Sequence, residues 1–493
     1  MACTAGDPVT RWHSSAADKA KPFALSSTGG LIGGAFVGAA SGQTLDVINP
    51  ATGAAFARVA DMGAEDTVAA VAAAKAALPA WAARSPYERS ALLRKLHDAM
   101  GAHAGGLAAL LTLECGKPLP EAAGEIAYGQ SFLDWFAEEG KRHYGEVIPP
   151  PRADRRLVTM RQPVGVAALL TPWNFSSAMV ARKLAPALAA GCTVVLRPSA
   201  ETPLSAMAIA QLATEVGFPK GVVNLVVGHD HAALAGTLCA HPDVAKVSFT
   251  GSTRVGKLLM AACAPGLKRM SLELGGDAPF IVFEDADIPA AVEGAIASKF
   301  RNAGQTCVCA NRIYVHDAVY ERFREHFVAK VSGARVPACL CVCAHASSVC
   351  VRMLVRACAF CVTTPHPHYH TPFLTTVSQT RALVVGDGFT AGVSVGPVIS
   401  RSARDKAERI VAEAVAGGAV VLAGGARVDV PGAGSGGFFY APTVLEGLPP
   451  GCAAATEELF APIAPLQRFR DEADVIARAN ATSVGLAGYF YTK

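Results

Sequence analysis

This chain contains the run Gly304-Gln305-Thr306-Cys307 and, upstream of it, the run Glu273-Leu274-Gly275-Gly276. A thiolate attacks carbonyl carbon readily, and a carboxylate can take a proton from water. Alone, a cysteine is usually a small buried side chain and a glutamate is usually a cap or an ion-pair partner. Together, the two runs supply a nucleophilic thiol and a water-activating carboxylate.

Length and composition favour a multidomain α/β enzyme. The chain has 493 residues, which exceeds what a single core supports, so we expect two or more domains. Hydrophobic residues make up 51% and charged residues 17%, and the net charge is only +4. This balance gives no sign of a nucleic-acid footprint or a membrane-surface patch, and no apolar run reaches the roughly 20 residues that a bilayer requires. The predicted partners are small molecules.

Strand-like and helix-like segments alternate along the chain, which is typical of a mostly parallel sheet covered by helices. Pro79 is expected to end the first of the helices below. The expected strands are 164–170, 192–196, 222–227 and 244–249, and the expected helices are 66–78, 178–190, one that starts at His231, and 257–262.

A turn from Gly251 to Gly256 follows the last of these strands and leads into a helix. The N-terminus of a helix offers free N–H groups and a positive dipole end to a phosphate. The turn has neither the Lys-Ser/Thr of a P-loop nor the Gly-x-Gly-x-x-Gly of a Rossmann fingerprint, so by itself it is a weak signal that also fits a packing turn.

The stretch 300–312, read with Glu273-Leu274-Gly275-Gly276, resembles the aldehyde dehydrogenase superfamily and is most similar to its succinate-semialdehyde branch. The resemblance implies an α/β, aldehyde dehydrogenase-like fold, with a Rossmann-like cofactor domain, an α/β catalytic domain and a partial oligomerisation arm. The implied boundaries are an N-terminal extension 1–25, a cofactor domain 26–143 and 164–272, an arm 144–163, a catalytic domain 273–332 and 382–470, and a return to the cofactor domain at 471–493.

The resemblance also assigns roles to the catalytic side chains. It makes Cys307 the nucleophile and Glu273 the general base, and it builds an oxyanion hole from the Asn174 amide and the Cys307 backbone N–H. The implied reaction is aldehyde oxidation through a thioester, with hydride transfer to NAD(P).

Cofactor choice depends on Arg197-Pro198-Ser199-Ala200. NAD-preferring relatives often have Glu at the fourth position, so Ala200 removes a carboxylate that would repel a 2′-phosphate. Arg197 and Ser199 could bind that phosphate, which favours NADP with NAD tolerated, although Arg197 could also be a surface base. The residues expected to hold the dinucleotide are Trp173, Arg197, Ser199, Gly251, Ser252, Glu458 and Phe460.

Substrate choice is expected to depend on Arg182 and Arg301, which match the arginines that hold the distal carboxylate of a four-carbon semialdehyde in the similar branch. Glutarate semialdehyde or simpler aldehydes are the alternative substrates. Cys309 forms Cys-x-Cys with Cys307, so it is a redox candidate or a small buried side chain.

Segment 333–381 interrupts the resemblance with an acid-free stretch that contains many cysteines and histidines. These residues match no standard zinc spacing, so we predict no metal. The resemblance implies a homo-oligomer, but the resemblance breaks off at Lys493 before the family's final strand, so the arm at 157–162 would lack its usual strand partner. An alternative is that the chain is an incomplete gene model whose product is catalytically silent. The scattered cysteines and the lack of a secretory signal predict an intracellular, cytoplasmic or mitochondrial, protein.

Overall fold

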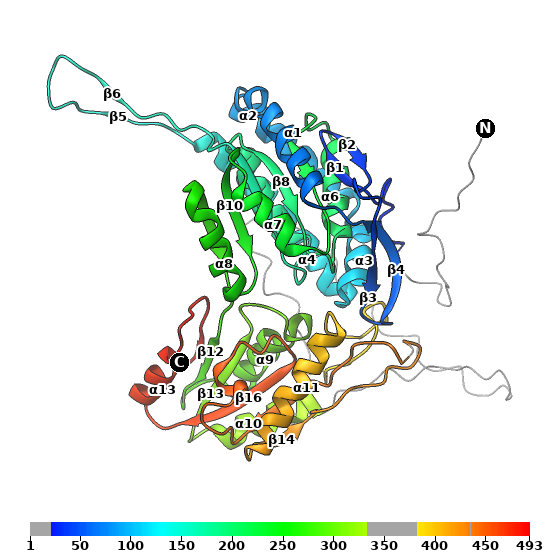
Figure 1. Ribbon diagram of the computed structural model, residues 1–493. Coiled ribbons are helices and arrows are strands. Elements are labelled where there is room, and N and C mark those ends of the chain that lie inside the picture. Colours follow the sequence, from blue (N-terminus) through cyan, green and yellow to red (C-terminus); the bar gives the residue numbers. More distant parts are fainter. Residues whose placement is uncertain (1–20, 333–381, 434) are drawn as a thin grey trace, which may run out of the picture.

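The computed structural model describes residues 21–332, 382–433 and 435–493. In these ranges the chain forms two bodies, each built around one β-sheet, which lie one above the other in Figure 1. The segment 333–381, with its predicted lack of a metal site, and most of the predicted extension 1–25 lie outside the described residues.

The upper body contains a seven-stranded sheet in which five strands run parallel. Two short antiparallel strands extend one edge of it. The strand order is β11 (Arg269–Glu273), β10 (Val244–Thr250), β7 (Val166–Leu170), β8 (Thr193–Arg197), β9 (Val223–Leu225), β1 (Gly30–Ile32) and β2 (Ala35–Val37). The predicted strands and the parallel, helix-covered sheet are therefore confirmed.

Helices cover both faces of this sheet because its strands are apolar on both sides. Along β7, Ala168 packs into one hydrophobic cluster and Ala167 and Leu169 pack into the other, as the period of two in a strand requires. The first cluster includes side chains of α1 (Ala64–Ala82), α7 (His231–Ala240) and α8 (Thr253–Cys263). The second includes α2 (Pro86–Ala102), α3 (Ala104–Cys115), α4 (Leu119–Glu139), α5 (Ala178–Ala189) and α6 (Leu204–Glu215).

The prediction that Pro79 ends the first helix is wrong, because α1 continues to Ala82. Proline removes one backbone donor, but the Ala83 N–H still donates to the Pro79 carbonyl at 3.1 Å. Trp81 is only 1% exposed and its ring lies 5.7 Å from that of Phe218. Burial of this large ring offsets the lost hydrogen bond and keeps the last turn helical.

The lower body contains a six-stranded sheet, parallel except at one edge. Its strand order is β14 (Val420–Ala423), β15 (Thr443–Glu446), β16 (Ile463–Phe469), β13 (Ala310–His316), β12 (Ala278–Val282) and β17 (Tyr489–Tyr491). Its helices are α9 (Ile288–Phe300), α10 (Tyr320–Ser332), α11 (Arg401–Ala416), α12 (Ala453–Thr456) and α13 (Glu472–Asn480). The short 3-10 helices of the two bodies are η1 (Gly140–Arg142), η2 (Ala264–Gly266) and η3 (Arg301–Gly304).

The expected return of 471–493 to the cofactor domain is wrong, since β17 pairs with β12 of the lower sheet. Its side chains alternate as a half-buried edge strand requires. The rings of Tyr489 and Tyr491 lie 6.0 and 5.3 Å from that of Phe280, whereas Phe490 is 68% exposed. Aromatic packing on one face therefore keeps this segment in the lower body.

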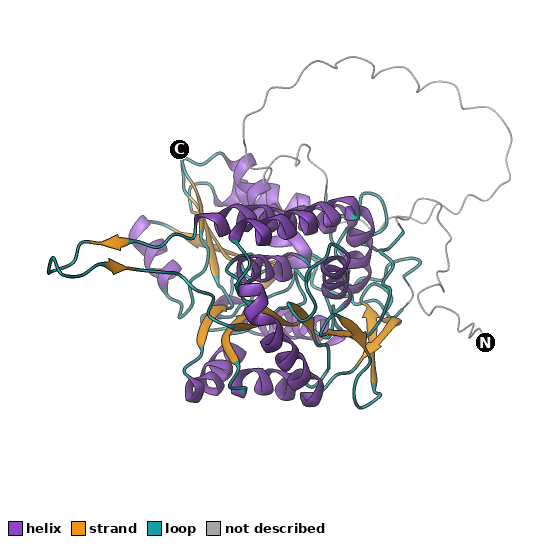
Figure 2. Cartoon of the chain, turned by 90° about the horizontal axis from the view of Figure 1, so that it is seen from above, coloured by secondary structure: helices purple, strands orange, loops and turns teal. Residues whose placement is uncertain are grey.

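Two hairpins lie outside the main sheets. The strands β3 (Thr44–Asn49) and β4 (Ala54–Ala60) pair with each other, as do β5 (Val147–Ile148) and β6 (Leu157–Val158). The β5–β6 hairpin extends far from the rest of the chain in both ribbon views (Figures 1 and 2). It coincides with the predicted arm 144–163, whose role in assembly stays a prediction.

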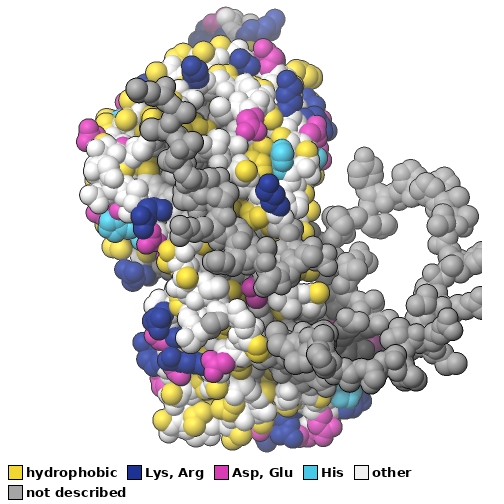
Figure 3. Space-filling view, turned by 90° about the vertical axis from the view of Figure 1, so that its right-hand side faces the viewer, with side chains coloured by type: hydrophobic (Ala, Val, Ile, Leu, Met, Phe, Trp, Pro, Cys, Tyr) yellow, Lys and Arg dark blue, Asp and Glu magenta, His cyan; other side chains and the backbone are white. Residues whose placement is uncertain are grey.

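Basic and acidic side chains are interspersed over both bodies on the face shown in Figure 3. This view agrees with the small net charge of the chain. Within the described ranges, no helix is both long and apolar enough to cross a bilayer.

Candidate active site

The order of strands in the upper sheet creates a site at one edge. The chain passes from β7 to β8 and β9 on one side, then returns to β10 on the other side of β7. In such sheets, ligands bind where this reversal occurs, at the carboxyl ends of the two central strands. A cleft of about 280 Å³ lies at this place, between the upper and lower bodies. Its lining includes Trp173, Asn174, Gly251, Ser252, Leu274, Gly275, Cys307, Lys406, Glu458 and Phe460.

A strained loop carries Cys307 into this cleft. Asn302, Ala303 and Gly304 all have positive φ, at 51°, 54° and 75°. A side chain on Gly304 would collide with the backbone of Ala461. The buried amide of Gln305 holds the loop, since its Nε2 donates to the Asn302 carbonyl at 2.9 Å and its Oε1 accepts from the Ile399 N–H at 2.8 Å. This bracing keeps the half-buried thiol in place.

The surroundings of Cys307 favour the neutral thiol. Burial, and then the nearby Glu458 carboxylate, raise the pKa of Cys307 above its ordinary value. A raised thiol pKa means that little thiolate is present at neutral pH, so attack on a carbonyl needs a proton acceptor.

Asn174 is brought against the cysteine loop as predicted. Its Nδ2 donates to the backbone carbonyl of Gln305 at 3.0 Å. An amide nitrogen carries two protons, so one remains for an oxyanion in the cleft. The Asn174 carbonyl accepts from the Lys117 ammonium at 2.8 Å and from the Asn302 amide at 3.1 Å, which fixes the backbone at this residue.

A buried ion pair beneath Asn174 was missed from the sequence. Lys117 pairs with Glu125, and both side chains are almost fully buried. Glu125 also accepts from the backbone N–H groups of Ser177 and Ala178, at 2.9 and 3.1 Å, where α5 begins. The pair thus ties the loop after β7 to α4. Its members are eight residues apart, and nothing in that spacing indicates that they bind the active-site loop.

The N-terminus of α8 opens on the same cleft. Ser252 caps this helix by accepting from the Val255 N–H, and Gly251 stands where a side chain would collide with the Phe249 ring. The free N–H groups of the first turn suit a phosphate. The predicted roles of Gly251 and Ser252 therefore fit their position, and these residues fit a dinucleotide.

Glu458 and Phe460 approach the cleft from the lower body. Glu458 Oε1 accepts from the Gly276 N–H at 3.3 Å, and a side chain on Gly275 would meet the Glu458 carboxylate at 2.5 Å. The Phe460 ring is perpendicular to that of Trp173 at 5.5 Å, with a φ of 51° at Phe460. The lower body thereby closes the cleft over the ends of β7 and β10.

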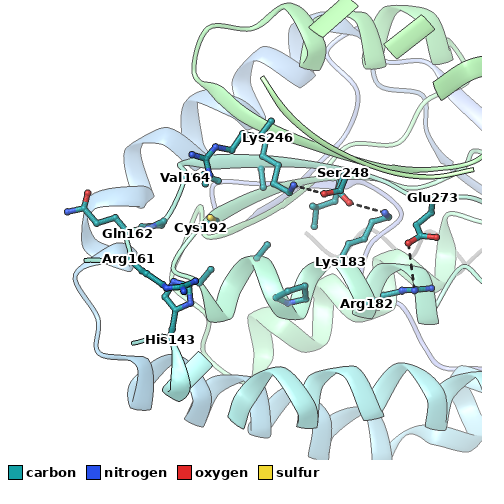
Figure 4. A pocket seen from close by; sticks show the side chains of 18 residues that line it. His143, Arg161, Gln162, Val164, Arg182, Lys183, Cys192, Lys246, Ser248 and Glu273 are labelled. Atoms are coloured by element: carbon teal, nitrogen blue, oxygen red, sulfur yellow. Dashed lines mark hydrogen bonds and ion pairs between the residues drawn. The ribbon is translucent and has the colours of Figure 1, made fainter. Parts of the chain in front are cut away.

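Glu273 lines a neighbouring, larger cavity of about 650 Å³ (Figure 4). It ends β11, and its carboxylate lies 3.9 Å from the Arg182 guanidinium of α5. Glu273 was predicted to act as the base for Cys307, but its side chain lines this cavity and not the cleft that contains Cys307, so its catalytic role stays a prediction. The carboxylate faces the cavity, while its chain neighbours Leu274 and Gly275 face the cleft.

The larger cavity is strongly basic. Lys183 Nζ donates to the Ser248 hydroxyl at 2.9 Å and Lys246 Nζ donates to the Ser271 hydroxyl at 2.7 Å, so neither ammonium is neutralised by these bonds. Burial lowers the pKa of Lys183 to about 8. The basic and acidic side chains that line the cavity are His143, Arg161, Arg182, Lys183, Lys246, Arg269 and Glu273.

Arg301 is not among the residues that line the cavity with Arg182. Arg301 begins η3, and its guanidinium lies 5.2 Å from the centre of the Phe175 ring. It lines neither the cleft nor the cavity. The predicted clamp by both arginines on one substrate carboxylate stays a prediction.

The remaining predicted residues lie at the edges of the site. Arg197 ends β8, with its guanidinium beside His231, and Ser199 donates to the Glu201 carboxylate. Glu201 and His231 were both missed from the sequence. Cys309 is buried, and both it and Cys307 carry free thiols, so its redox role stays a prediction.

Comparison with known proteins agrees with this geometry. The model of the aldehyde dehydrogenase family matches residues 36–339 and 366–493. The chain belongs to the aldehyde dehydrogenase family. This membership confirms the predicted fold class and the predicted enzyme class.

The sequences of individual relatives align with nearly the whole length of this aldehyde dehydrogenase. It is 48% identical to the succinate-semialdehyde dehydrogenase [NADP(+)] of Escherichia coli, over 94% of this chain and 85% of that one. It is 46% identical to a glutarate-semialdehyde dehydrogenase of Pseudomonas aeruginosa, over 94% and 84%. Its structure is similar to that of betaine aldehyde dehydrogenase from Staphylococcus aureus in complex with NAD+, with a TM-score of 0.83, 31% identity and coverage of 95% and 83%.

Proposed function

We propose that this aldehyde dehydrogenase oxidises a semialdehyde that carries a distal carboxylate, succinate semialdehyde foremost, to the corresponding diacid. The observation that carries the proposal is the pairing of two spaces. A cleft contains Cys307 and Asn174, and a basic cavity containing Arg182 adjoins it at Glu273. The first can hold the aldehyde carbon and the second can attract the carboxylate.

In the proposed reaction, the Cys307 thiol gives its proton to water in the cleft, and its sulfur attacks the aldehyde carbon to form the anion of a thiohemiacetal. The free N–H of the Asn174 amide and the backbone N–H of Cys307 donate to the oxygen that becomes negative. A bound nicotinamide dinucleotide supplies the hydride acceptor. Loss of hydride from the thiohemiacetal leaves a thioester on Cys307.

Glu273 is the proposed base for the second half of the reaction. It takes a proton from water, which attacks the thioester and releases the acid and the thiol. Because the carboxylate pairs with Arg182 in this structure, the proposal requires the side chain to rotate about its own bonds toward the Cys307 side. A longer substrate, glutarate semialdehyde, is the second candidate, since it shares the distal carboxylate and a relative at 46% identity is named for it.

The proposed cofactor is NADP or NAD, with NADP preferred. The E. coli relative is named for NADP(+), and the S. aureus structure contains NAD+. Trp173, Glu458 and Phe460 are proposed to enclose the nicotinamide end. Assembly into a homo-oligomer through the β5–β6 hairpin, and a cytoplasmic or mitochondrial location, are further proposals; the latter is supported by a relative from Arabidopsis thaliana named as mitochondrial.

The test compares succinate semialdehyde with butanal, which has the same carbon number and no carboxylate. Arg182→Gln is expected to lower kcat/KM for succinate semialdehyde by about 10- to 100-fold, the effect of losing one charge-assisted hydrogen bond, and to leave butanal nearly unchanged. Arg269→Gln is the matched control. It also removes a positive charge from the cavity, but Arg269 lies at the opposite end of β11 from Glu273, so the loss for succinate semialdehyde should be smaller than in Arg182→Gln.

An equal loss for both aldehydes in Arg182→Gln would contradict carboxylate recognition and leave only a structural role. Glutarate semialdehyde completes the series. If its kcat/KM exceeds that of succinate semialdehyde, the longer substrate replaces the shorter one in the proposal.

A further inference from the structure

The turn that carries Cys307 has a second side, which follows the nucleophile. The Cys309 N–H donates to the Thr306 carbonyl at 3.0 Å and closes the turn. The peptide between Val308 and Cys309 therefore belongs to the same ring of atoms as Cys307. The carbonyl of this peptide is a strong acceptor, and a donor that binds it also restrains Cys307.

Tyr489 is the donor for this carbonyl. Its hydroxyl donates to the Val308 oxygen at 2.7 Å, across 181 residues of chain. Burial raises the pKa of Tyr489, so the hydroxyl keeps its proton well above neutral pH. The hydroxyl therefore remains a donor to the turn over the pH range in which a dehydrogenase is assayed.

Ser298, on α9, fixes the direction of this bond. The Ala310 N–H donates to the Ser298 hydroxyl oxygen at 3.1 Å. The Ser298 hydroxyl also bonds the Tyr489 oxygen, and it can give its own proton there because its oxygen already accepts from Ala310. The bonds thus run from the N–H of Ala310, through two hydroxyls, to the carbonyl of Val308. They enclose Cys309 and direct the Tyr489 proton to the turn.

The pairing of β17 with β12 brings Tyr489 to the turn. Tyr489 and Tyr491 lie on the same face of the strand and pack on the Phe280 ring, at 6.0 and 5.3 Å. The Tyr491 hydroxyl lies over Gly294 of α9, where a Cβ would collide with it, and it forms no hydrogen bond within the described ranges. The strand therefore presents two tyrosines with matched packing, of which Tyr489 alone bonds the cysteine turn.

Tyr489 lines neither the cleft nor the basic cavity, so it can act on the reaction only through the turn. We propose, on the basis of the proposed dehydrogenase function, that Tyr489 is a positioning residue for the nucleophile. Its hydroxyl holds the peptide that follows Cys307, and it thereby fixes both the sulfur and the backbone N–H that serves as an oxyanion donor. Small displacements of these atoms lower the rate without weakening binding, because the near-attack geometry is lost.

The test is Tyr489→Phe, which removes one oxygen and keeps the ring. The readout is the rate constant of NADPH formation in a single turnover, with the enzyme in excess over the aldehyde and NADP saturating. This rate constant is expected to fall about three- to tenfold, the effect of one neutral hydrogen bond, and to fall equally for succinate semialdehyde and butanal. The Kd of NADPH and the enzyme concentration that gives half the maximal rate should stay at the wild-type values, whereas a general loosening of the fold would change them.

Tyr491→Phe is the matched control. It removes the other hydroxyl from the same face of β17 and should leave the rate constant unchanged, because that hydroxyl has no partner in the turn. Replacement of Tyr489 by 4-aminophenylalanine tests rescue. This side chain keeps the ring and offers an N–H donor in place of the O–H, so the rate constant should return to about half of the wild-type value or more.

Three results would overturn the inference while leaving the dehydrogenase function intact. The first is an unchanged rate constant in Tyr489→Phe. The second is an equal loss in Tyr491→Phe, which would make the effect a property of the strand edge. The third is a loss with succinate semialdehyde alone, which would make Tyr489 a determinant of carboxylate recognition. A wild-type chain that forms neither NADPH nor acid would instead overturn the proposed function.

Discussion

The cleft around Cys307 and the cavity around Arg182 are neighbours with opposite character. Among the described residues, the cleft is lined by a single cation and a single carboxylate, Lys406 and Glu458. The cavity is lined by five arginine and lysine side chains and one carboxylate, Glu273. Positive charge close to a thiol would lower its pKa, but the pKa of Cys307 is raised. The positive charge that would attract an anionic substrate therefore does not activate the nucleophile.

This separation has a kinetic consequence. Changes in the cleft should affect every aldehyde alike, since they act on the bond-forming atoms. Changes in the cavity should affect only substrates with a second negative charge. Glu273 stands between the two, because its backbone neighbours line the cleft while its carboxylate faces the cavity.

The largest effect is expected from Cys307→Ser. Loss of the sulfur nucleophile should reduce kcat by about 10⁴-fold or more for both succinate semialdehyde and butanal. Cys309→Ser is the control, since this buried neighbour does not line the cleft and should retain most activity. Steady-state measurements of kcat for both variants with both aldehydes test this prediction. Substantial activity in Cys307→Ser would remove the covalent step from the account.

Asn174→Ala should have the next largest effect. Removal of one oxyanion donor is expected to lower kcat by about 10²- to 10³-fold for both aldehydes. Asn174→Asp should be no better, because a carboxylate cannot donate. Binding of NADPH, followed by its fluorescence, should stay at the wild-type Kd. A loss of activity with succinate semialdehyde alone would mean that Asn174 recognises the substrate carboxylate and is not an oxyanion donor.

The pH dependence of KM tests the cavity. The pKa of Lys183 is lowered to about 8, so its charge is present below that pH and is lost above it. The KM for succinate semialdehyde should therefore rise about three- to tenfold above this pH, as one attracting charge disappears. Lys183→Met should have the high KM at every pH. A parallel rise in the KM for butanal would show that the effect is not electrostatic.

The smallest effect concerns the reactivity of the thiol. Glu458→Gln removes the carboxylate that helps to raise the pKa of Cys307, so more thiolate should be present near neutral pH. Alkylation of Cys307 by iodoacetamide, followed by mass spectrometry of its peptide, should be about two- to fivefold faster. Glu457→Gln changes the adjacent exposed residue and should have no effect. A slower reaction in Glu458→Gln would contradict this influence of the carboxylate.

The regular elements of the upper sheet were predictable because buried parallel strands are short, continuous apolar runs between helices. Local signals failed where distant packing decides the structure. The burial of Trp81 stabilises α1 beyond Pro79, and aromatic contacts to Phe280 stabilise the pairing of β17 with the lower sheet. No local pattern contains these contacts.

The candidate site divides in the same way. Cys307, Glu273 and Asn174 stand in recognisable runs, and the structure brings Asn174 and Cys307 to one cleft. Glu125 and His231 act on Lys117 and Arg197, which are 8 and 34 residues away in the chain. Such partners can be identified only from the structure, because the packing of α4 and α7 brings them into contact. Arg301 is the opposite case, because its sequence position predicted a substrate-binding role, whereas its side chain lines neither the cleft nor the cavity.

The most direct test of the central claim is a single turnover of Glu273→Gln with succinate semialdehyde and NADP. With the proposed base removed, acyl transfer to sulfur should proceed and its hydrolysis should stall. The account predicts a burst of NADPH close to one per chain, and a Cys307 peptide whose mass has increased by the acyl group. Absence of both the burst and the modified peptide, in a protein that still binds NADP, would contradict it.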